Sequence, residues 1–165
     1  ELAYPDRMNA AVELLDRAVA AGEGGRTAVV NDAGSWTYAA LKDLSDRIAR
    51  LLVEDGGLVP GNRVLLRGAN SCTLIACWFA VLKAGGVVVT TMPMLRAGEL
   101  RPILEKAAIS HALVDSRCLE DWRPAADASR HLRWTATFDG DLGTGALEAL
   151  AAAQPAGFAA HVGPS

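Results

Sequence analysis

The stretch that decides the fold reads Leu82-Lys83-Ala84-Gly85-Gly86-Val87-Val88-Val89-Thr90-Thr91. Its two glycines end an apolar helical segment over residues 72–84, because glycine readily adopts the left-handed backbone conformation that closes a helix. The β-branched run that follows is typical of a parallel strand covered on both faces. We therefore predict a helix feeding a strand at residues 87–91, and we expect that strand to lie at the centre of a sheet.

Helix and strand patterns alternate on both sides of this stretch. Strands are expected at residues 27–30, 35–37, 63–66, 87–91, 110–114 and 131–137. Helices are expected at residues 10–21, 38–55, 72–84, 98–108, 119–129 and 144–152. Alternating elements connect through right-handed crossovers, which place the strands in parallel. The sequence predicts an α/β fold, with a mainly parallel sheet and helices on both faces, over residues 1–153; a Pro/Gly/Ala tail follows at 154–165.

Composition bounds the class of protein. The chain has 165 residues, enough for one domain at roughly 150 residues per domain. Lysine and arginine total 16 and aspartate and glutamate 19, so the net charge of −3 argues against a nucleic-acid binder. No apolar run reaches the roughly 18 to 20 residues that cross a bilayer, and residues 1–10 lack a signal pattern. We expect a cytoplasmic protein that binds neither nucleic acid nor membranes.

Two hydroxyl residues stand where helices should begin, Thr37 before residues 38–55 and Ser71 before residues 72–84. Each is expected to cap its helix. A full capping box would need glutamate three residues after Thr37; Ala40 leaves half of it, at a cost under ~1 kcal/mol. The polar face of the first helix is expected to carry Lys42, Asp43, Asp46 and Arg47.

Motifs that carry chemistry are absent from the sequence: there is no phosphate loop, dinucleotide fingerprint, nucleophile elbow or zinc-protease helix. The histidines lack clustered acidic or cysteine neighbours, so we expect His111, His131 and His161 to be structural or exposed. The cysteines do not have the spacing of a zinc site, and their odd number argues against a disulfide framework. We therefore expect three cysteines to be buried as small apolar side chains: Cys72, Cys77 and Cys118.

Asp115 ends a predicted strand, where doubly wound sheets place ligand-binding groups. An aspartate at such a position is more often a cap of a helix or turn. We expect the capping role. The sequence therefore predicts no catalytic residue and no metal ligand in this chain.

Three segments resemble motifs of the adenylate-forming enzymes, which include acyl-CoA ligases, luciferases and adenylation domains of peptide synthetases. Ser35–Leu41, SWTYAAL, is similar to their (T)YxEL opening, and Gly61–Leu66, GNRVLL, resembles their GDRV strand. Leu82–Pro93 matches their LKAGxxxxPxxP segment, and Leu95–Leu100 follows in the expected place. The resemblance covers nearly the whole chain and implies the N-terminal subdomain of the adenylate-forming fold.

A finer resemblance points to the benzoate branch of this family. Asn9–Arg17 is similar to the opening helix of benzoate and 2-aminobenzoate CoA ligases. Ala76–Gly86 and Thr91–Arg96 look most like the 2-aminobenzoate enzymes.

These enzymes use ATP and Mg²⁺ to join a carboxylic acid to AMP, and then transfer the acyl group to coenzyme A. Their phosphate loop, nucleotide-binding acids and C-terminal lysine would lie beyond Ser165. The resemblance thus implies the N-terminal portion of a longer enzyme, inactive alone, with residues 154–165 leading toward the missing phosphate loop. Its implied partners are a small aromatic acid and CoA, and a homo-oligomer is compatible with it.

Two cations are candidates for CoA binding by this resemblance. Lys83 stands where relatives place a basic residue near the CoA nucleotide phosphate, and Arg96 is the weaker candidate. The structural alternatives are that Lys83 complements a helix dipole and that Arg96 is a solvated loop residue. Three other functions stay open: a carrier-protein-loading adenylation domain, a fatty-acyl-CoA ligase, and a non-catalytic flavodoxin-like binding module.

Overall fold

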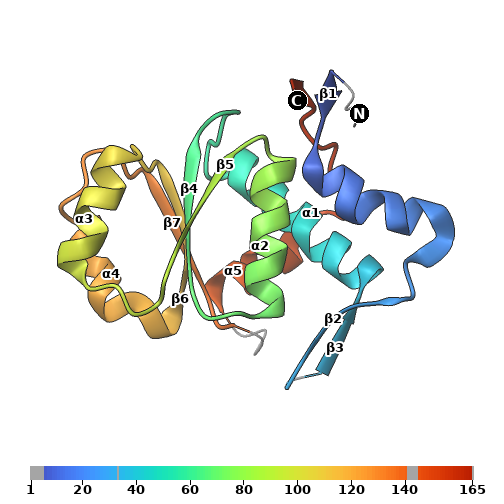
Figure 1. Ribbon diagram of the computed structural model, residues 1–165, viewed down its shortest axis with the longest axis horizontal. Coiled ribbons are helices and arrows are strands. Elements are labelled where there is room, and N and C mark those ends of the chain that lie inside the picture. Colours follow the sequence, from blue (N-terminus) through green and yellow to red (C-terminus); the bar gives the residue numbers. More distant parts are fainter. Residues whose placement is uncertain (1–5, 33, 141–144, 165) are drawn as a thin grey trace, which may run out of the picture.

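The computed structural model describes residues 6–32, 34–140 and 145–164 (Figure 1). It confirms the α/β class. The main sheet runs in the order β5-β4-β6-β7, and all its neighbouring strands are parallel. Val64 of β4 is in register with Val88 of β5 on one side and His111 of β6 on the other. The strands are β4 (Arg63–Arg67), β5 (Val87–Thr91), β6 (His111–Asp115) and β7 (Trp134–Phe138).

Helices cover both faces of this sheet, as predicted (Figure 1). One face carries α1 (Tyr38–Glu54), α2 (Cys72–Lys83) and α5 (Ala146–Ala153). The other carries α3 (Ala97–Lys106) and α4 (Leu119–Ala126), the latter preceded by a 3₁₀ turn, η3 (Ser116–Cys118). Successive residues of β4 point to opposite faces, so Leu66 joins the core under α1 and α2 while Leu65 joins the core under α3 and α4.

Both predicted caps are present. The Oγ1 of Thr37 accepts a hydrogen bond from the Ala40 N–H at 3.2 Å, and the Oγ of Ser71 accepts one from the Leu74 N–H at 3.1 Å. Gly85 ends α2 with φ +77°, the left-handed conformation expected there. The predicted helix starting at Thr144 begins instead at Ala146, and Thr144 itself lies outside the described residues.

The N-terminal part lies beside α1. The predicted helix over residues 10–21 contains π-helical turns η1 (Val12–Asp16) and η2 (Val19–Glu23). An antiparallel hairpin of β2 (Thr27–Asn31) and β3 (Gly34–Thr37) follows and projects from the body in Figure 1.

The tail packs against the rest of the chain. Arg50 donates a 2.6 Å hydrogen bond to the carbonyl of Gly157, and its guanidinium lies 5.9 Å from the centre of the Phe158 ring. Near the end of the tail, β1 (Arg7–Met8) pairs with β8 (Gly163–Pro164). The domain boundary at residue 153 stays a prediction, but residues 154–164 are no free linker.

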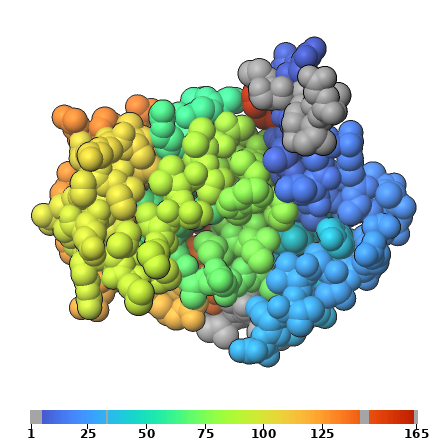
Figure 2. All heavy atoms as spheres, viewed as in Figure 1, coloured from blue at the N-terminus to red at the C-terminus, as the bar shows by residue number. Residues whose placement is uncertain are grey.

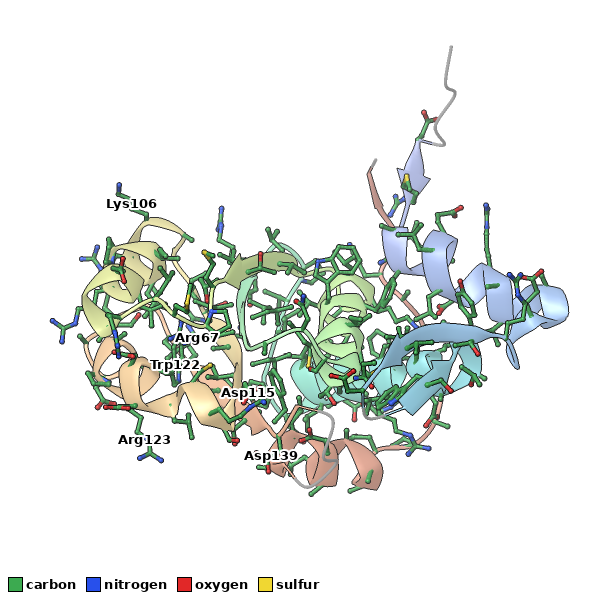
Figure 3. The ribbon with its side chains drawn as sticks, turned by 60° about the horizontal axis from the view of Figure 1, so that its bottom comes forward. Arg67, Lys106, Asp115, Trp122, Arg123 and Asp139 are labelled. Carbon is green, nitrogen blue, oxygen red and sulfur yellow. The ribbon has the colours of Figure 1, made fainter. Side chains whose placement is uncertain are left out.

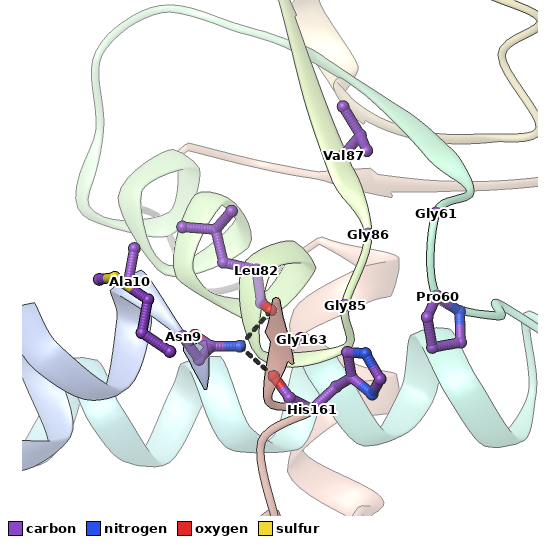
Figure 4. Close-up of a pocket in the computed structure, with 11 residues that line it drawn as sticks. Asn9, Ala10, Pro60, Gly61, Leu82, Gly85, Gly86, Val87, His161 and Gly163 are labelled. Atoms are coloured by element: carbon purple, nitrogen blue, oxygen red, sulfur yellow. Dashed lines mark hydrogen bonds between the residues drawn. The ribbon is translucent and has the colours of Figure 1, made fainter. Parts of the chain in front are cut away.

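The tail also closes one side of a cavity of about 560 Å³ (Figure 4). Asn9 Nδ2 donates 2.7 Å hydrogen bonds to the carbonyls of Leu82 and His161, and the His161 N–H donates to the carbonyl of Lys83 at 2.7 Å. The His161 ring covers Gly85 so closely that a Cβ there would lie 2.7 Å from it. Both termini of the described chain are therefore fastened to the C-terminal end of α2.

The predicted central position of β5 is wrong. Among the described residues β5 has one neighbour, β4, and it forms an edge of the sheet with Val87 47% exposed. The crossover through α3 returns the chain to the far side of β4, where β6 pairs. A β-branched run reports a preference for burial and carries no information on which strands lie beside it.

Predictions for single residue types are mostly confirmed. Cys72 and Cys77 are buried, whereas Cys118 is partly exposed, contrary to expectation. His111 is buried, with its ring nitrogens 2.8 Å from Ser110 Oγ and 2.9 Å from the carbonyl oxygen of Gly56, which fits a structural role. No helix in the described part of the chain has the length and apolar character needed to span a membrane.

Candidate functional site

The carboxyl ends of the parallel strands are the first place to look for a site. Ligands of α/β sheets bind where neighbouring connections leave toward opposite faces. That point lies between β4 and β6, because α2 follows β4 on one face and α4 follows β6 on the other (Figure 3). A Cβ on Gly68 would lie 2.9 Å from the Phe138 ring and 3.0 Å from Asp115 Cβ. The chain's own side chains fill the crevice at this point.

Asp115 is held by Arg117 just beyond β6. Its Oδ1 accepts from the backbone N–H of Arg117 at 2.9 Å and from Nε at 2.8 Å, and its Oδ2 accepts from a guanidinium NH₂ at 2.5 Å. Burial acts to raise the pKa of Asp115, but the hydrogen bonds and charge of Arg117 outweigh it and hold that pKa below its ordinary value. Asp115 therefore caps η3 as an ionised carboxylate, as the sequence predicts.

A second polar group adjoins it at the end of β7. Ser116 Oγ donates to Asp139 Oδ1, and the Asp139 N–H donates to Glu148 Oε1 at 3.1 Å. Burial raises the pKa of Glu148 above its ordinary value, although backbone N–H groups act in the opposite direction. These contacts join the ends of β6 and β7 to α5. No group of metal-ligating side chains occurs in the described part of the chain.

Arg67 closes the carboxyl end of β4 and was not singled out by the sequence. Its guanidinium is buried and donates to the carbonyls of Met92, Pro93 and Leu95 at 2.9, 2.9 and 2.7 Å. These hydrogen bonds fix the loop that leaves β5 to the end of β4, beside a cavity of about 370 Å³. The only available signal was a charged residue ending a buried strand, which usually indicates a solvent-facing strand end.

Lys83 lies in the interior. Its ammonium is 0% exposed, donates to Asp46 Oδ1 at 2.5 Å, and forms an ion pair with Asp16 Oδ1 at 2.7 Å without a well-directed hydrogen bond. An ammonium buried between two carboxylates is neither free to contact a phosphate nor placed at a solvent-exposed helix end. The geometry thus gives no support to the CoA-phosphate role, which stays a prediction.

The placement of Asp46 on the polar face of α1 is wrong. Its side chain is 1% exposed because it lies between Lys83 and Lys42, whose Nζ is 2.6 Å from Asp46 Oδ2. Burial acts to lower the pKa of Lys42, but the hydrogen bond and charge of Asp46 outweigh it and raise that pKa. The isolated lysine in the otherwise apolar α2 could have signalled a buried acidic partner.

Arg96 lies on the other side of the sheet. Its side chain is 77% exposed and forms an ion pair with Asp121 at 3.1 Å, while its N–H donates to Glu99 Oε2 at 2.8 Å at the start of α3. This is the solvated position that the structural alternative describes. The structure does not bring the two predicted CoA contacts together, because α2 and α3 cover opposite faces (Figure 1).

Three charged side chains of the described chain, those of Lys83, Arg67 and Asp115, are not available to hold ATP or Mg²⁺. A triphosphate needs several converging N–H groups or cations, and Mg²⁺ needs carboxylate oxygens. Here the buried Lys83 and Arg67 are engaged by groups of the chain itself, and the Asp115 carboxylate is engaged by Arg117. The contacts at this edge position loops and helices.

Comparison with known proteins shows the family. The sequence profile described as AMP-binding enzyme matches residues 15–159. The chain belongs to the AMP-binding enzyme family. It is 31% identical over 120 residues to a benzoate–CoA ligase of Thauera aromatica, in an alignment covering 73% of this chain and 23% of that one. It is 37% identical over 94 residues to a salicyl-AMP ligase/salicyl-S-ArCP synthetase of Mycobacterium tuberculosis, covering 56% of this chain and 16% of that one.

The AMP-binding fold is also shared with solved structures. An anthranilate CoA ligase in complex with anthranoyl-AMP superposes with a TM-score of 0.85 at 19% identity, covering 96% of this chain and 30% of that one. The chain thus spans less than a third of the length of these relatives.

The buried ion pairs of Lys83 generate a stability prediction. Lys83→Met keeps the side-chain stem but leaves Asp46 and Asp16 without their shared cation. Because Asp46 keeps Lys42 as a partner, we expect the free energy of unfolding to fall by about 3 kcal/mol, at the lower end of the range for a broken buried ion pair. Urea unfolding at pH 7 measures this change. Lys106→Met is the matched control, because Lys106 also ends a helix but is exposed; it should cost under ~1 kcal/mol. Equal losses would show that Lys83 acts through the helix dipole alone.

The Asp115–Arg117 pair generates a pH prediction. A carboxylate with a lowered pKa stabilises the fold above its ordinary pKa of about 3.9, and this contribution is lost as the pH falls through the folded-state value. Asp115→Asn should therefore cost about 1 to 2 kcal/mol at pH 7, and less below pH ~4. Asp43→Asn removes a carboxylate that is 49% exposed, whereas that of Asp115 is 1% exposed, and should cost about 0.5 kcal/mol or less. A loss from Asp115→Asn that does not change with pH would contradict the assignment.

Proposed function

We propose that residues 1–165 form the N-terminal portion of an ATP-dependent aryl-acid:CoA ligase acting on benzoate or 2-aminobenzoate in the cytoplasm. The family match over residues 15–159 carries the proposal, and the benzoate–CoA ligase match and the fold of the anthranilate CoA ligase favour an aromatic acid. The longer enzyme would form acyl-AMP and pyrophosphate from acid and ATP, and then acyl-CoA and AMP from acyl-AMP and CoA.

This portion would serve as a scaffold in that reaction. The side chains of Arg67, Lys83 and Asp115 are engaged by other groups of the chain, so ATP, Mg²⁺ and the acid would be bound mainly by residues outside it. Family membership argues against the non-catalytic flavodoxin-like module. A fatty-acyl-CoA ligase stays an alternative within the family.

A carrier-protein-loading adenylation enzyme is the second candidate. The match to a salicyl-S-ArCP synthetase favours it, because that relative's name describes transfer to a carrier protein. The two candidates share the acyl-AMP step and differ only in the thiol that accepts the acyl group. Release of AMP on adding CoA to the acyl-AMP form of the longer enzyme separates them.

The adenylation step gives the main test of the proposed function. We expect the longer enzyme to catalyse ATP–pyrophosphate exchange stimulated by benzoate or 2-aminobenzoate, and the 165-residue chain to show only background exchange, because it supplies no phosphate cradle. Octanoate is the matched substrate control. Stronger stimulation by octanoate would contradict the aromatic assignment, and exchange by the purified short chain would contradict the scaffold role.

Lys83→Met in the longer enzyme tests the predicted CoA contact. Because the ammonium is buried between carboxylates, we expect pyrophosphate exchange and CoA-dependent turnover to fall together, along with Tm. A direct phosphate contact would instead raise KM for CoA and leave exchange and Tm unchanged.

A further inference from the structure

The cavity of about 560 Å³ lies at the amino ends of β4 and β5, at the opposite ends of these strands from the carboxyl edge (Figure 4). Its lining comes from the N-terminal segment, from the turns that precede the two strands, and from the tail. Figure 2 shows the red atoms of the tail between the blue N-terminal part and the green body of the molecule. The volume falls in the range of small-molecule sites, about 300 to 1,000 Å³.

One wall of the cavity is flat and weakly polar. Gly85 and Gly86 present bare backbone there, bordered by the ring of Pro60 and the side chain of Val87 (Figure 4). The Gly61 N–H donates to the carbonyl of Gly85 at 2.9 Å, so the chain's own backbone holds this wall in place. Because glycine has no side chain, a ligand can approach the peptide plane directly. Such a wall favours a ligand with a planar, largely apolar body.

The imidazole of His161 is fixed beside this wall. The His161 N–H donates to the carbonyl of Lys83, and its carbonyl accepts from Asn9 Nδ2, both at 2.7 Å. The ring lies against Gly85, where a Cβ would be 2.7 Å from it. Neither ring nitrogen has a hydrogen-bond partner among the residues that the structure describes. A neutral imidazole donates one hydrogen bond and a protonated one donates two, so His161 offers a positioned donor in either state.

The charges around the cavity favour an anion. Of the residues that line it, all within the described part of the chain, His161 alone has an ionisable side chain and none is acidic. Arg7 adds a positive charge at the rim, because its guanidinium donates at 2.6 Å to the carbonyl of Val162, next to the lining residue Gly163. A carboxylate placed here can accept charge-assisted hydrogen bonds.

We propose that this cavity binds a planar aromatic carboxylate, with its ring on the Gly85–Gly86 backbone and its carboxylate on His161. This site is separate from the one that the proposed reaction requires, because it lies away from the carboxyl edge of the sheet. An aliphatic acid suits it less well, since a flexible chain loses more conformational freedom on binding than a rigid ring does. A bound acid would contact both the N-terminal segment and the tail, and would therefore stabilise the folded chain.

Titration of the isotope-labelled 165-residue chain with 2-aminobenzoate, followed by NMR, tests the site. We expect saturable binding with a Kd of about 1 mM or tighter, which is ordinary for a ligand of this size. The largest shift changes should fall on the backbone amides of Gly61, Gly85, Gly86 and Gly163. Octanoate lacks the ring and benzamide lacks the carboxylate, so each should bind more weakly by about 10-fold or more.

Two substitutions test the lining directly. His161→Phe keeps a ring and both backbone hydrogen bonds but removes the ring nitrogens, so it should weaken binding of 2-aminobenzoate by about 10-fold. Val87→Trp fills the cavity from a residue that is 47% exposed, so it should abolish binding with little change in Tm. His131→Phe is the matched control, because this histidine lies before β7 and does not line the cavity; it should leave Kd unchanged.

Several results would overturn the proposal. Absence of saturable binding, or shift changes centred on the carboxyl ends of the strands, would show that the acid does not occupy this cavity. Equal affinity for benzamide would contradict the role of the carboxylate, and tighter binding of octanoate would identify an aliphatic ligand instead. Unchanged binding by Val87→Trp and His161→Phe would show an adventitious contact only. These measurements use no ATP, so their failure is distinguishable from failure of the proposed function.

Discussion

An ammonium that no water reaches constrains how the helices over one face of the sheet assemble. Lys83 must keep carboxylate partners wherever it is buried, because an unpaired buried charge costs several kcal/mol. Asp46 brings α1 to it, Asp16 brings η1, and its own carbonyl accepts the N–H of His161. Four segments distant in sequence thus meet at the end of α2. The buried charge holds the N-terminal helix and α1 to α2, and the backbone carbonyl of the same residue holds the tail.

At the carboxyl ends of the strands, buried charged groups are likewise satisfied by partners within the chain. Arg67 satisfies three carbonyls of the loop after β5, and Arg117 neutralises Asp115 after β6. Gly68 lets β4 end against Phe138 without steric conflict. In many α/β proteins this edge holds a ligand. Here its side chains hold the connections that leave the sheet, which agrees with a scaffold role within a larger AMP-binding enzyme.

Local signals in the sequence were sufficient for most elements. Thr37 and Ser71 determine where two helices begin, and the apolar runs determine β4 and β6, because these features act over a few residues. The edge position of β5 and the burial of Asp46 could not be predicted in this way. Both depend on contacts between segments far apart in the chain, which periodicity does not encode. The same reason explains why Arg67 was missed: its partners lie 25 to 28 residues away.

The pairing of the two ends also affects how the chain folds. Arg7 donates to the carbonyl of Val162, a contact that closes a loop of 155 residues. Closing a loop of that length costs roughly 4 kcal/mol in chain entropy at 25 °C, so the contact forms after the shorter-range packing of α1 on α2. At about 5 to 20 residues per second of synthesis, Arg7 waits on the order of ten seconds for its partner to be made. During that interval the nascent N-terminal helix lacks this contact with the C-terminal segment.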